Sequence, residues 1–348
     1  MNPSTEQLRR SLLIATLDSL DTPHHLGPAI ISTAAKSSET LVVVLLSPLF
    51  ELRHAPGSQG ALAPTAESSV APISRTERWD DVQRLLTYVY VQATKVAQDN
   101  GRILMDVSVL LRGYERPLPT DLAEGMDMCF LVQGDDNVPS LPLSIRTLPQ
   151  TVLPSGNRVS MFSDSSPSKS SAGETFPPLY PVVILGGTFD HLHAGHKILL
   201  SMGAWISERK LIIGVTDDIL LQGKLHSDLL ESFSVRVEKT RSFLQLFRPD
   251  LEYEFAAITD VYGPTGWDPD IQALVVSTET LSGAVAIAKE RARKSLPALQ
   301  TFVIDVISPD SEKLDHEDAE LLRQTKMSST FIREWIAKNH DVERNGNR

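Results

Sequence analysis

The feature that most constrains this chain is an apolar strand that runs directly into two glycines and then into a helix. Residues 182–185 are all apolar, so we expect them to form a buried parallel strand. Gly186 and Gly187 end this strand with backbone that carries no Cβ atom, so a ligand can approach closely. Apolar residues then recur at helical spacing, which predicts a helix over 196–208.

Two histidines stand at the start of that helix. His193 and His196 are three residues apart and share one face of its first turn. With the free backbone N–H groups of a helix start, they would form a phosphate site. Two other interpretations stay open on these residues alone: a histidine pair in an ordinary core, and a zinc site made with His191. The zinc site is the weaker one, because no carboxylate stands in helical register as in HExxH.

Composition limits the class of protein. The 348 residues carry a net charge of −11, from 33 basic and 44 acidic side chains. This balance argues against a general nucleic-acid binder and against binding to anionic membranes. No apolar run is long enough to span a bilayer. Cys129 is the only cysteine, so a disulfide within the chain is impossible and a reducing compartment is expected. We expect a cytoplasmic protein, with the nucleus as a second compartment.

The chain is expected to have two α/β parts. Residues 1–150 form a predicted N-terminal α/β domain of unknown role, in which the pair His24-His25 is best interpreted as a surface turn. Residues 151–178 are rich in Ser and Pro and predict a disordered linker that carries little packing. Residues 179–348 alternate strands and helices, which predicts a Rossmann-like domain with a five-stranded parallel sheet. No internal repeat is found in the sequence. The strands of the second domain are expected at 182–185, 211–215, 251–258, 273–277 and 301–307, and its helices at 196–208, 232–247, 283–296 and 329–338.

Further groups suited to phosphate follow the first motif. Lys224 comes after a glycine in the loop behind the second predicted strand, and Ser328 and Ser329 precede the last predicted helix. Alone, these would be a solvated lysine and an ordinary helix N-cap. They also suit the phosphates of a nucleotide, because a lysine and free helix N–H groups both attract anions. Arg236, at the start of another helix, is equally ambiguous.

Taken together, residues 181–337 resemble the phosphopantetheine adenylyltransferases of the eukaryotic coenzyme A pathway, within the HxGH nucleotidyltransferase superfamily. The resemblance rests on GGTFDHLHAGH at 186–196, DVYGPTGWDP at 260–269, VVSTET at 275–280 and KMSS at 326–329. It implies transfer of AMP from ATP to 4'-phosphopantetheine by direct in-line attack, giving dephospho-coenzyme A and pyrophosphate. It also implies Mg²⁺ carried with ATP, and other enzymes of the pathway as partners.

The resemblance implies a role for each matching residue. His193, His196 and Lys224 would be catalytic, and no protein ligand to a metal is implied. ATP would contact Gly186, Gly187, Thr188, Phe189, His196, Lys289, Arg291, Ser328, Ser329 and Thr330. The acceptor would contact Thr188, Asp190, Lys224, Asp260, Tyr262 and Gly263. Ala284 and Ala288 stand where the family often has Gly and Asn, which weakens the contacts expected from their helix.

Three alternatives remain on the sequence. One is another HxGH nucleotidyltransferase, acting on nicotinamide mononucleotide or on a cytidylyl acceptor. A class I aminoacyl-tRNA synthetase shares HxGH and a KMSKS-like element, but the acidity of the chain disfavours it. The third is a catalytically inactive regulatory binding protein that keeps the transferase fold.

Overall fold

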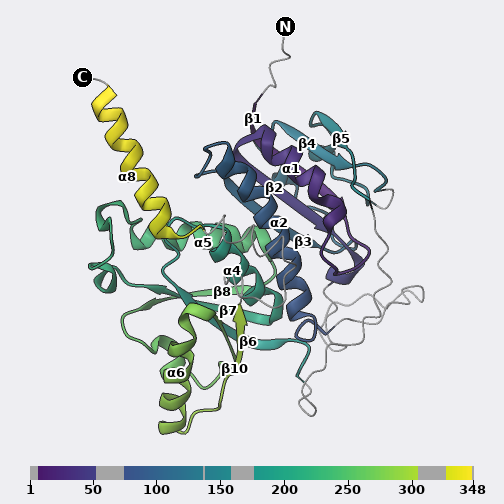
Figure 1. The fold of residues 1–348 in the computed structure, drawn as a ribbon. Coiled ribbons are helices and arrows are strands. Elements are labelled where there is room, and N and C mark those ends of the chain that lie inside the picture. Colours follow the sequence, from purple (N-terminus) through teal and green to yellow (C-terminus); the bar gives the residue numbers. More distant parts are fainter. Residues whose placement is uncertain (1–6, 52–73, 136–137, 158–175, 305–326, 347–348) are drawn as a thin grey trace, which may run out of the picture.

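The computed structural model describes residues 7–51, 74–135, 138–157, 176–304 and 327–346. The described chain is an α/β protein with two five-stranded parallel sheets, which confirms the predicted fold class (Figure 1). None of the described helices is both long enough and apolar enough to cross a membrane.

The first sheet belongs to the N-terminal part of the chain. Its edge strand lies at 150–153, so the sheet extends past the boundary expected at 150. Most of the predicted linker, 158–175, lies outside the described residues. The elements are β1 (Leu8–Thr16), α1 (Gly27–Lys36), β2 (Ser37–Leu46), α2 (Trp79–Asp99), β3 (Asp106–Arg112), β4 (Met128–Val132), α3 (Leu143–Arg146) and β5 (Gln150–Leu153).

The second sheet carries the motifs. Its first strand, helix and glycine turn lie where the apolar pattern predicts them. The end of the last predicted strand, 305–307, lies outside the described residues. The elements are β6 (Tyr180–Gly187), α4 (Ala194–Ile206), β7 (Ser207–Thr216), α5 (Phe233–Phe247), β8 (Glu252–Ile258), β9 (Ala273–Ser277), α6 (Leu281–Arg293), β10 (Gln300–Ile304) and α8 (Ser329–Gly346).

The two sheets repeat one topology. Their strand orders are β3-β2-β1-β4-β5 and β8-β7-β6-β9-β10. If the strands of each part are numbered from one to five along the chain, both sheets have the order 3-2-1-4-5. The registers also agree. Leu8 pairs with Ser37 and an irregularity follows before Arg10, just as Tyr180 pairs with Ser207 and an irregularity follows before Val182.

A second register and a helix end show the same repeat. Ser11 pairs with Met128, and the residue equivalent to Ser11, Val183, pairs with Ala273. Ser37 and Ser207 are both buried, and each donates its hydroxyl to the carbonyl four residues earlier, at 2.8 and 2.7 Å. The chain therefore contains a structural repeat, and the expectation of no repeat was wrong at the level of the fold.

The two parts share one hydrophobic core. α2 packs against α4, and a single cluster of buried apolar residues extends over both sheets. Trp205 of α4 meets Phe50 edge-on with ring centroids 6.0 Å apart, and its indole N–H donates to the carbonyl of Arg75 at 3.0 Å. Arg112 of β3 donates to the carbonyl of Phe247 at the end of α5, at 2.6 Å. The two parts of the described chain are therefore packed against each other.

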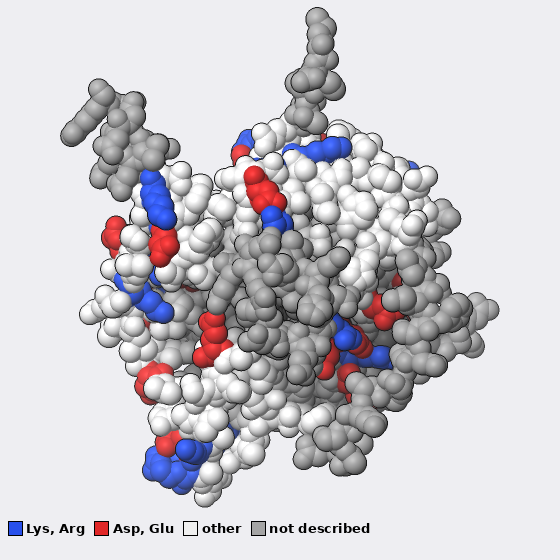
Figure 2. Space-filling model, in the orientation of Figure 1, with Lys and Arg blue, Asp and Glu red and all other residues white. Residues whose placement is uncertain are grey.

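Charge is distributed without large single-sign areas on the face drawn in Figure 2. There, acidic and basic side chains of the described residues lie interspersed among neutral ones.

The shared core generates a prediction about truncation. A chain that starts at Phe176 would expose the apolar side of α4 and α5, including Trp205, which the N-terminal part covers in the full protein. We expect this fragment to aggregate or to bind a hydrophobic dye strongly, as measured by light scattering and dye fluorescence against the full chain. A soluble, dye-negative fragment with cooperative unfolding would contradict this expectation.

Candidate active site

A cavity of about 540 Å³ lies at the carboxyl ends of the second sheet's strands. Ligands of open parallel sheets bind at this edge. Its walls come from the loop after β6, the first turn of α4, the loop after β7, the end of β9 and the start of α8. Most of the sequence-predicted site residues meet here: Gly186, Gly187, Thr188, His193, His196, Lys224, Ser328, Ser329 and Thr330.

The two glycines are required by close packing at the strand end. A Cβ atom on Gly186 would lie 3.1 Å from a methyl of Ile258, and one on Gly187 would lie 3.0 Å from the Phe189 ring. Phe189 itself is fully buried, with its ring 5.4 Å from that of His196. Phe189 therefore supports the histidine from the core and is not among the described residues that line the cavity, contrary to the expected ATP contact.

The histidine pair lies at the centre of the site. The rings of His193 and His196 stack with centroids 4.0 Å apart. The Nδ1 atom of each is buried and has no hydrogen-bond partner among the described residues. Burial, with a smaller contribution from His191, lowers the pKa of His193 to about 4. Burial, then the neighbouring His193, lowers the pKa of His196 well below its usual range. Both imidazoles are therefore neutral at pH 7.

The zinc interpretation receives no support from the geometry. Among the described residues, no three His, Cys, Asp or Glu side chains are placed to share a metal ion. The third histidine, His191, is occupied elsewhere, because its Nε2 atom lies 2.9 Å from the carbonyl of Leu229.

Two helix starts point positive ends toward the cavity. α4 begins after His193 without a side-chain cap, so its first N–H groups have no partner within the helix. α8 is capped by Ser328, whose hydroxyl accepts from the N–H of Phe331 at 3.2 Å. The hydroxyl of Ser329 donates to the carbonyl of Asp190 at 2.7 Å, which joins α8 to the loop after β6. Lys224 adds an exposed cation from the loop after β7.

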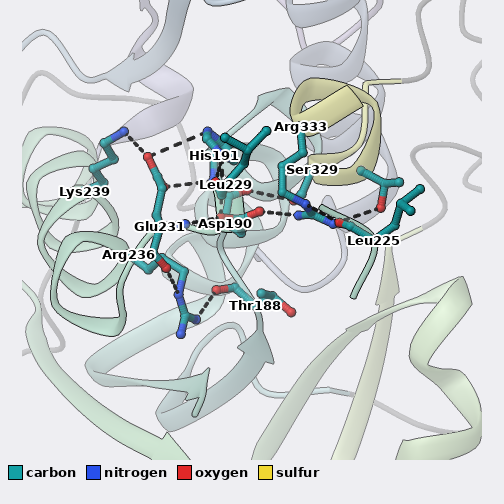
Figure 3. Close-up of polar contacts among 11 residues, drawn as sticks. Thr188, Asp190, His191, Leu225, Leu229, Glu231, Arg236, Lys239, Ser329 and Arg333 are labelled. Carbon is teal, nitrogen blue, oxygen red and sulfur yellow. Dashed lines mark hydrogen bonds and ion pairs between the residues drawn. The ribbon is translucent and has the colours of Figure 1, made fainter. Parts of the chain in front are cut away.

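A buried polar network fixes the loop after β6 (Figure 3). Asp190 is fully buried; its Oδ1 accepts from the N–H of Glu231 at 2.9 Å and its Oδ2 from Arg333. Arg236 is also fully buried and donates to the carbonyls of Thr188 and Glu231, at 2.6 and 3.1 Å. The network holds a loop in which two residues other than glycine have positive φ, Phe189 at 52° and His191 at 44°.

The network places two residues that the sequence singled out. Both carboxylate oxygens of Asp190 have partners inside the protein, so Asp190 shapes the loop. Arg236, ambiguous in the sequence, supports the same loop from within the core. Neither residue is among the described residues that line the cavity.

The structure also does not bring the expected α6 contacts to the cavity. Arg291 is 1% exposed and donates to the carbonyls of Thr265, Asp268 and Pro297, at 2.7, 2.9 and 2.7 Å. It thus fixes the loop after β8. Lys289 is exposed and lies outside the set of described residues that line the cavity.

The acceptor residues expected after β8 are not among the described residues that line this cavity; they are Asp260, Tyr262 and Gly263. Asp260 accepts from the N–H groups of Tyr262 and Gly263, at 2.9 and 2.7 Å, and so closes its own turn. The cavity has a further wall after β9, formed by Thr278, Glu279 and Thr280. The sequence analysis assigned these residues no role in the site. Their position after a buried parallel strand was the available signal.

Comparison with known proteins identifies the class. Residues 184–335 match the family model "Cytidylyltransferase-like", so the second sheet and its cavity define a nucleotidyltransferase domain. The chain is 42% identical over 157 residues to the phosphopantetheine adenylyltransferase of Saccharomyces cerevisiae, which covers 45% of this chain and 49% of that protein. It is 38% identical over 125 residues to the phosphopantetheine adenylyltransferase of Pyrobaculum aerophilum, covering 36% of this chain and 79% of that protein. The chain belongs to the phosphopantetheine adenylyltransferase family, which confirms the resemblance seen in the sequence.

The share of each relative's length that matches this chain differs between the relatives. An uncharacterised protein of Schizosaccharomyces pombe is 41% identical over 157 residues, which cover 45% of this chain and 48% of that protein. The chain thus matches about half the length of its two yeast relatives. A solved structure of a protein with unknown function from Archaeoglobus fulgidus is 33% identical, with a TM-score of 0.32, and covers 36% of this chain and 90% of that chain.

The lowered pKa values of the histidines predict acid sensitivity. A histidine whose pKa is lowered by folding binds a proton more readily when unfolded, so stability is complete above about pH 6.5 and falls as the pH drops toward about 4. His193 alone should cost about 1–2 kcal/mol of unfolding free energy between pH 7 and pH 5. Urea unfolding at both pH values measures this, with the double variant His193→Gln/His196→Gln as comparison. Equal pH dependence in both proteins would show that the histidines do not titrate as stated.

Proposed function

We propose that this protein transfers AMP from ATP to 4'-phosphopantetheine. A phosphate oxygen of the acceptor attacks the α-phosphorus of ATP, the bond from that phosphorus to the oxygen bridging to the β-phosphate breaks, and pyrophosphate leaves. The product is dephospho-coenzyme A. The observation that carries the proposal is the pair of buried, neutral histidines with unpartnered Nδ1 atoms at the uncapped start of α4. The names of the yeast and archaeal relatives support this choice of substrates.

The chemistry requires positioning and charge stabilisation, and no covalent intermediate on the protein. In this proposal His193 and His196 donate N–H groups to the α- and β-phosphates, next to the free N–H groups of the α4 start. As neutral donors in the folded first turn of α4, they would be preorganised for the charge that develops in the transition state. Thr188 lies between the glycine turn and the histidine pair, and it would contact both ATP and 4'-phosphopantetheine.

Two further groups complete the proposed charge pattern. Lys224 would stabilise the charge on the reacting phosphate, because it is the exposed cation on this cavity wall. Ser328, Ser329 and Thr330 would surround the β- and γ-phosphates, mainly through backbone N–H groups of α8, since two of the hydroxyls already have partners.

Mg²⁺ belongs to the proposal as an ion carried by ATP. Among the described lining residues Glu279 is the only carboxylate, and this donor set fits an ion that keeps phosphate oxygens and water as its main ligands. When bound, the ion would neutralise charge on the phosphate oxygens. Contacts with other enzymes of the coenzyme A pathway stay a prediction.

The test is an assay of pyrophosphate release with ATP and 4'-phosphopantetheine. Nicotinamide mononucleotide with ATP, and a cytidylyl acceptor with CTP, run in parallel and test the alternative acceptors. Faster turnover with either alternative would replace the proposed substrates. A protein that binds ATP but turns over none of these mixtures would instead be an inactive binding protein.

His196→Ala should fold normally and lose about 10²–10³-fold in kcat, because one preorganised donor to developing charge is removed. Steady-state kinetics measures the loss, and circular dichroism checks the fold. His24→Ala, an exposed histidine of the N-terminal part, is the matched control and should keep wild-type kcat. Wild-type turnover in a folded His196→Ala protein would remove the histidine from the mechanism.

Lys224→Ala should lower kcat more than it raises the KM for ATP. The lysine is proposed to act on charge that appears mainly in the transition state, so ground-state binding depends on it less. Lys95→Ala, whose ammonium pairs with Asp99 on α2 of the N-terminal part, serves as control. If Lys224→Ala changed only KM, the lysine would be a binding residue.

A further inference from the structure

The structural repeat allows the N-terminal part to be compared with the active site position by position. Gly186 and Gly187 correspond to Ile14 and Ala15, which are both fully buried. A branched side chain and a methyl group therefore occupy the strand end where the second sheet has two glycines that line the cavity.

The N-terminal part also has other residues at the positions equivalent to the two histidines. Counted back from the equivalent serines Ser37 and Ser207, Pro23 stands in the place of His193 and Leu26 in the place of His196. Leu26 is fully buried and neither replacement can donate a side-chain hydrogen bond. The N-terminal part has the frame of the transferase domain without its phosphate-binding groups.

Lys197 connects this frame to the catalytic helix. It follows His196 directly, in the first turn of α4, and its side chain is 3% exposed. Its ammonium pairs with Asp106 and donates to the carbonyl of Val107 at 2.8 Å and to the hydroxyl of Ser108 at 2.9 Å. All three partners belong to β3 of the first sheet, so the three donors of the ammonium are used across the boundary between the two parts.

The equivalent position in the first sheet shows that this contact is particular to α4. Counted from the same serines, Gly27 stands in the place of Lys197. A Cβ atom on Gly27 would lie 2.7 Å from the hydroxyl of Tyr88, on α2. There the helix start packs on a helix of its own part, whereas in the second part it reaches the neighbouring sheet.

A cavity next to this contact makes it mechanically important. The start of α4 lines this cavity of about 610 Å³ together with residues of β3, α5 and α8. His193 lines this cavity as well as the nucleotide cavity, and the bonds of Lys197 tie its turn to β3 beside this space. The other end of α4 is held too, since Arg75 donates to the carbonyl of Trp205 at 3.1 Å.

We propose that Lys197 is a positioning residue, which holds His193 and His196 in place by joining α4 to β3 of a divergent N-terminal repeat. The proposal rests on the proposed function of the histidines. The N-terminal part would thus serve the reaction as a fixed support for the catalytic helix. A small shift of preorganised donors is sufficient to lower a rate by about 10²-fold.

The test uses Lys197→Met in the full chain, which removes the ammonium and keeps the length of the side chain. We expect kcat to fall about 10–100-fold while the KM for ATP changes much less. Lys210→Met is the matched control: Lys210 is partly buried and pairs with Glu254 at 2.9 Å, within the second sheet and away from the cavity. It should keep wild-type kcat. A fall in kcat no larger than that of the control would overturn the proposal.

Two additional measurements keep the outcome clear. Asp106→Asn and Ser108→Ala change the β3 side, where Asp106 is half exposed, and each should lower kcat in the same direction without further loss when combined with Lys197→Met. Additive losses would contradict a shared contact. The imidazole NMR signals of His193 and His196 should move in Lys197→Met but not in Lys210→Met. Since this readout needs no turnover, it separates failure of the positioning role from failure of the proposed reaction.

Discussion

The buried ion pair between Asp190 and Arg333 joins the two ends of the transferase domain. The residues are 143 positions apart, and neither is more than 2% exposed. The pair brings the loop after β6 to the start of α8, so that the first and last of the proposed phosphate-binding motifs line one cavity together. Removing one partner would leave a buried charge, at a cost of about 3–5 kcal/mol. The pair also fixes a loop with two unfavourable backbone conformations, and the histidines follow directly on that loop.

The apolar periods were sufficient to predict the second sheet, because the long buried runs lie in its central strands β6, β7 and β9 and its helices are amphipathic. They were insufficient for β1, where Arg9 and Arg10 precede the apolar run and obscure the strand. The predicted site residues that line the cavity stand next to backbone signals, such as a glycine turn or a helix start. Arg291 and Asp190 are not among the described lining residues, because sequence shows a charge but not its direction. In the fold both charges satisfy backbone groups in the core.

The repeat could not be read from the sequence for a related reason. Register and strand order depend on backbone pairing and on which faces are buried, and many apolar sequences satisfy these conditions. The side chains that mark the second part in the sequence are those of the site, and the equivalent positions of the N-terminal part carry Ile14, Ala15, Pro23 and Leu26 instead. The archaeal relative is covered to 79% by 125 residues of this chain, so that relative is little longer than the transferase domain. In this chain, Trp205 and Lys197 of α4 make contacts with the N-terminal part.

These contacts bear on how an acidic protein with a net charge of −11 can receive a triphosphate. Cationic histidines buried at an empty site would cost several kcal/mol of desolvation, and burial keeps both imidazoles neutral instead. Neutral donors contribute direction more than charge, so their value depends on accurate placement. In the proposed reaction, the attraction for the triphosphate would come from two helix starts and from the exposed Lys224. A site of this kind needs a rigid support for its histidines more than it needs additional cations, and the bonds from β3 to the first turn of α4 supply that rigidity.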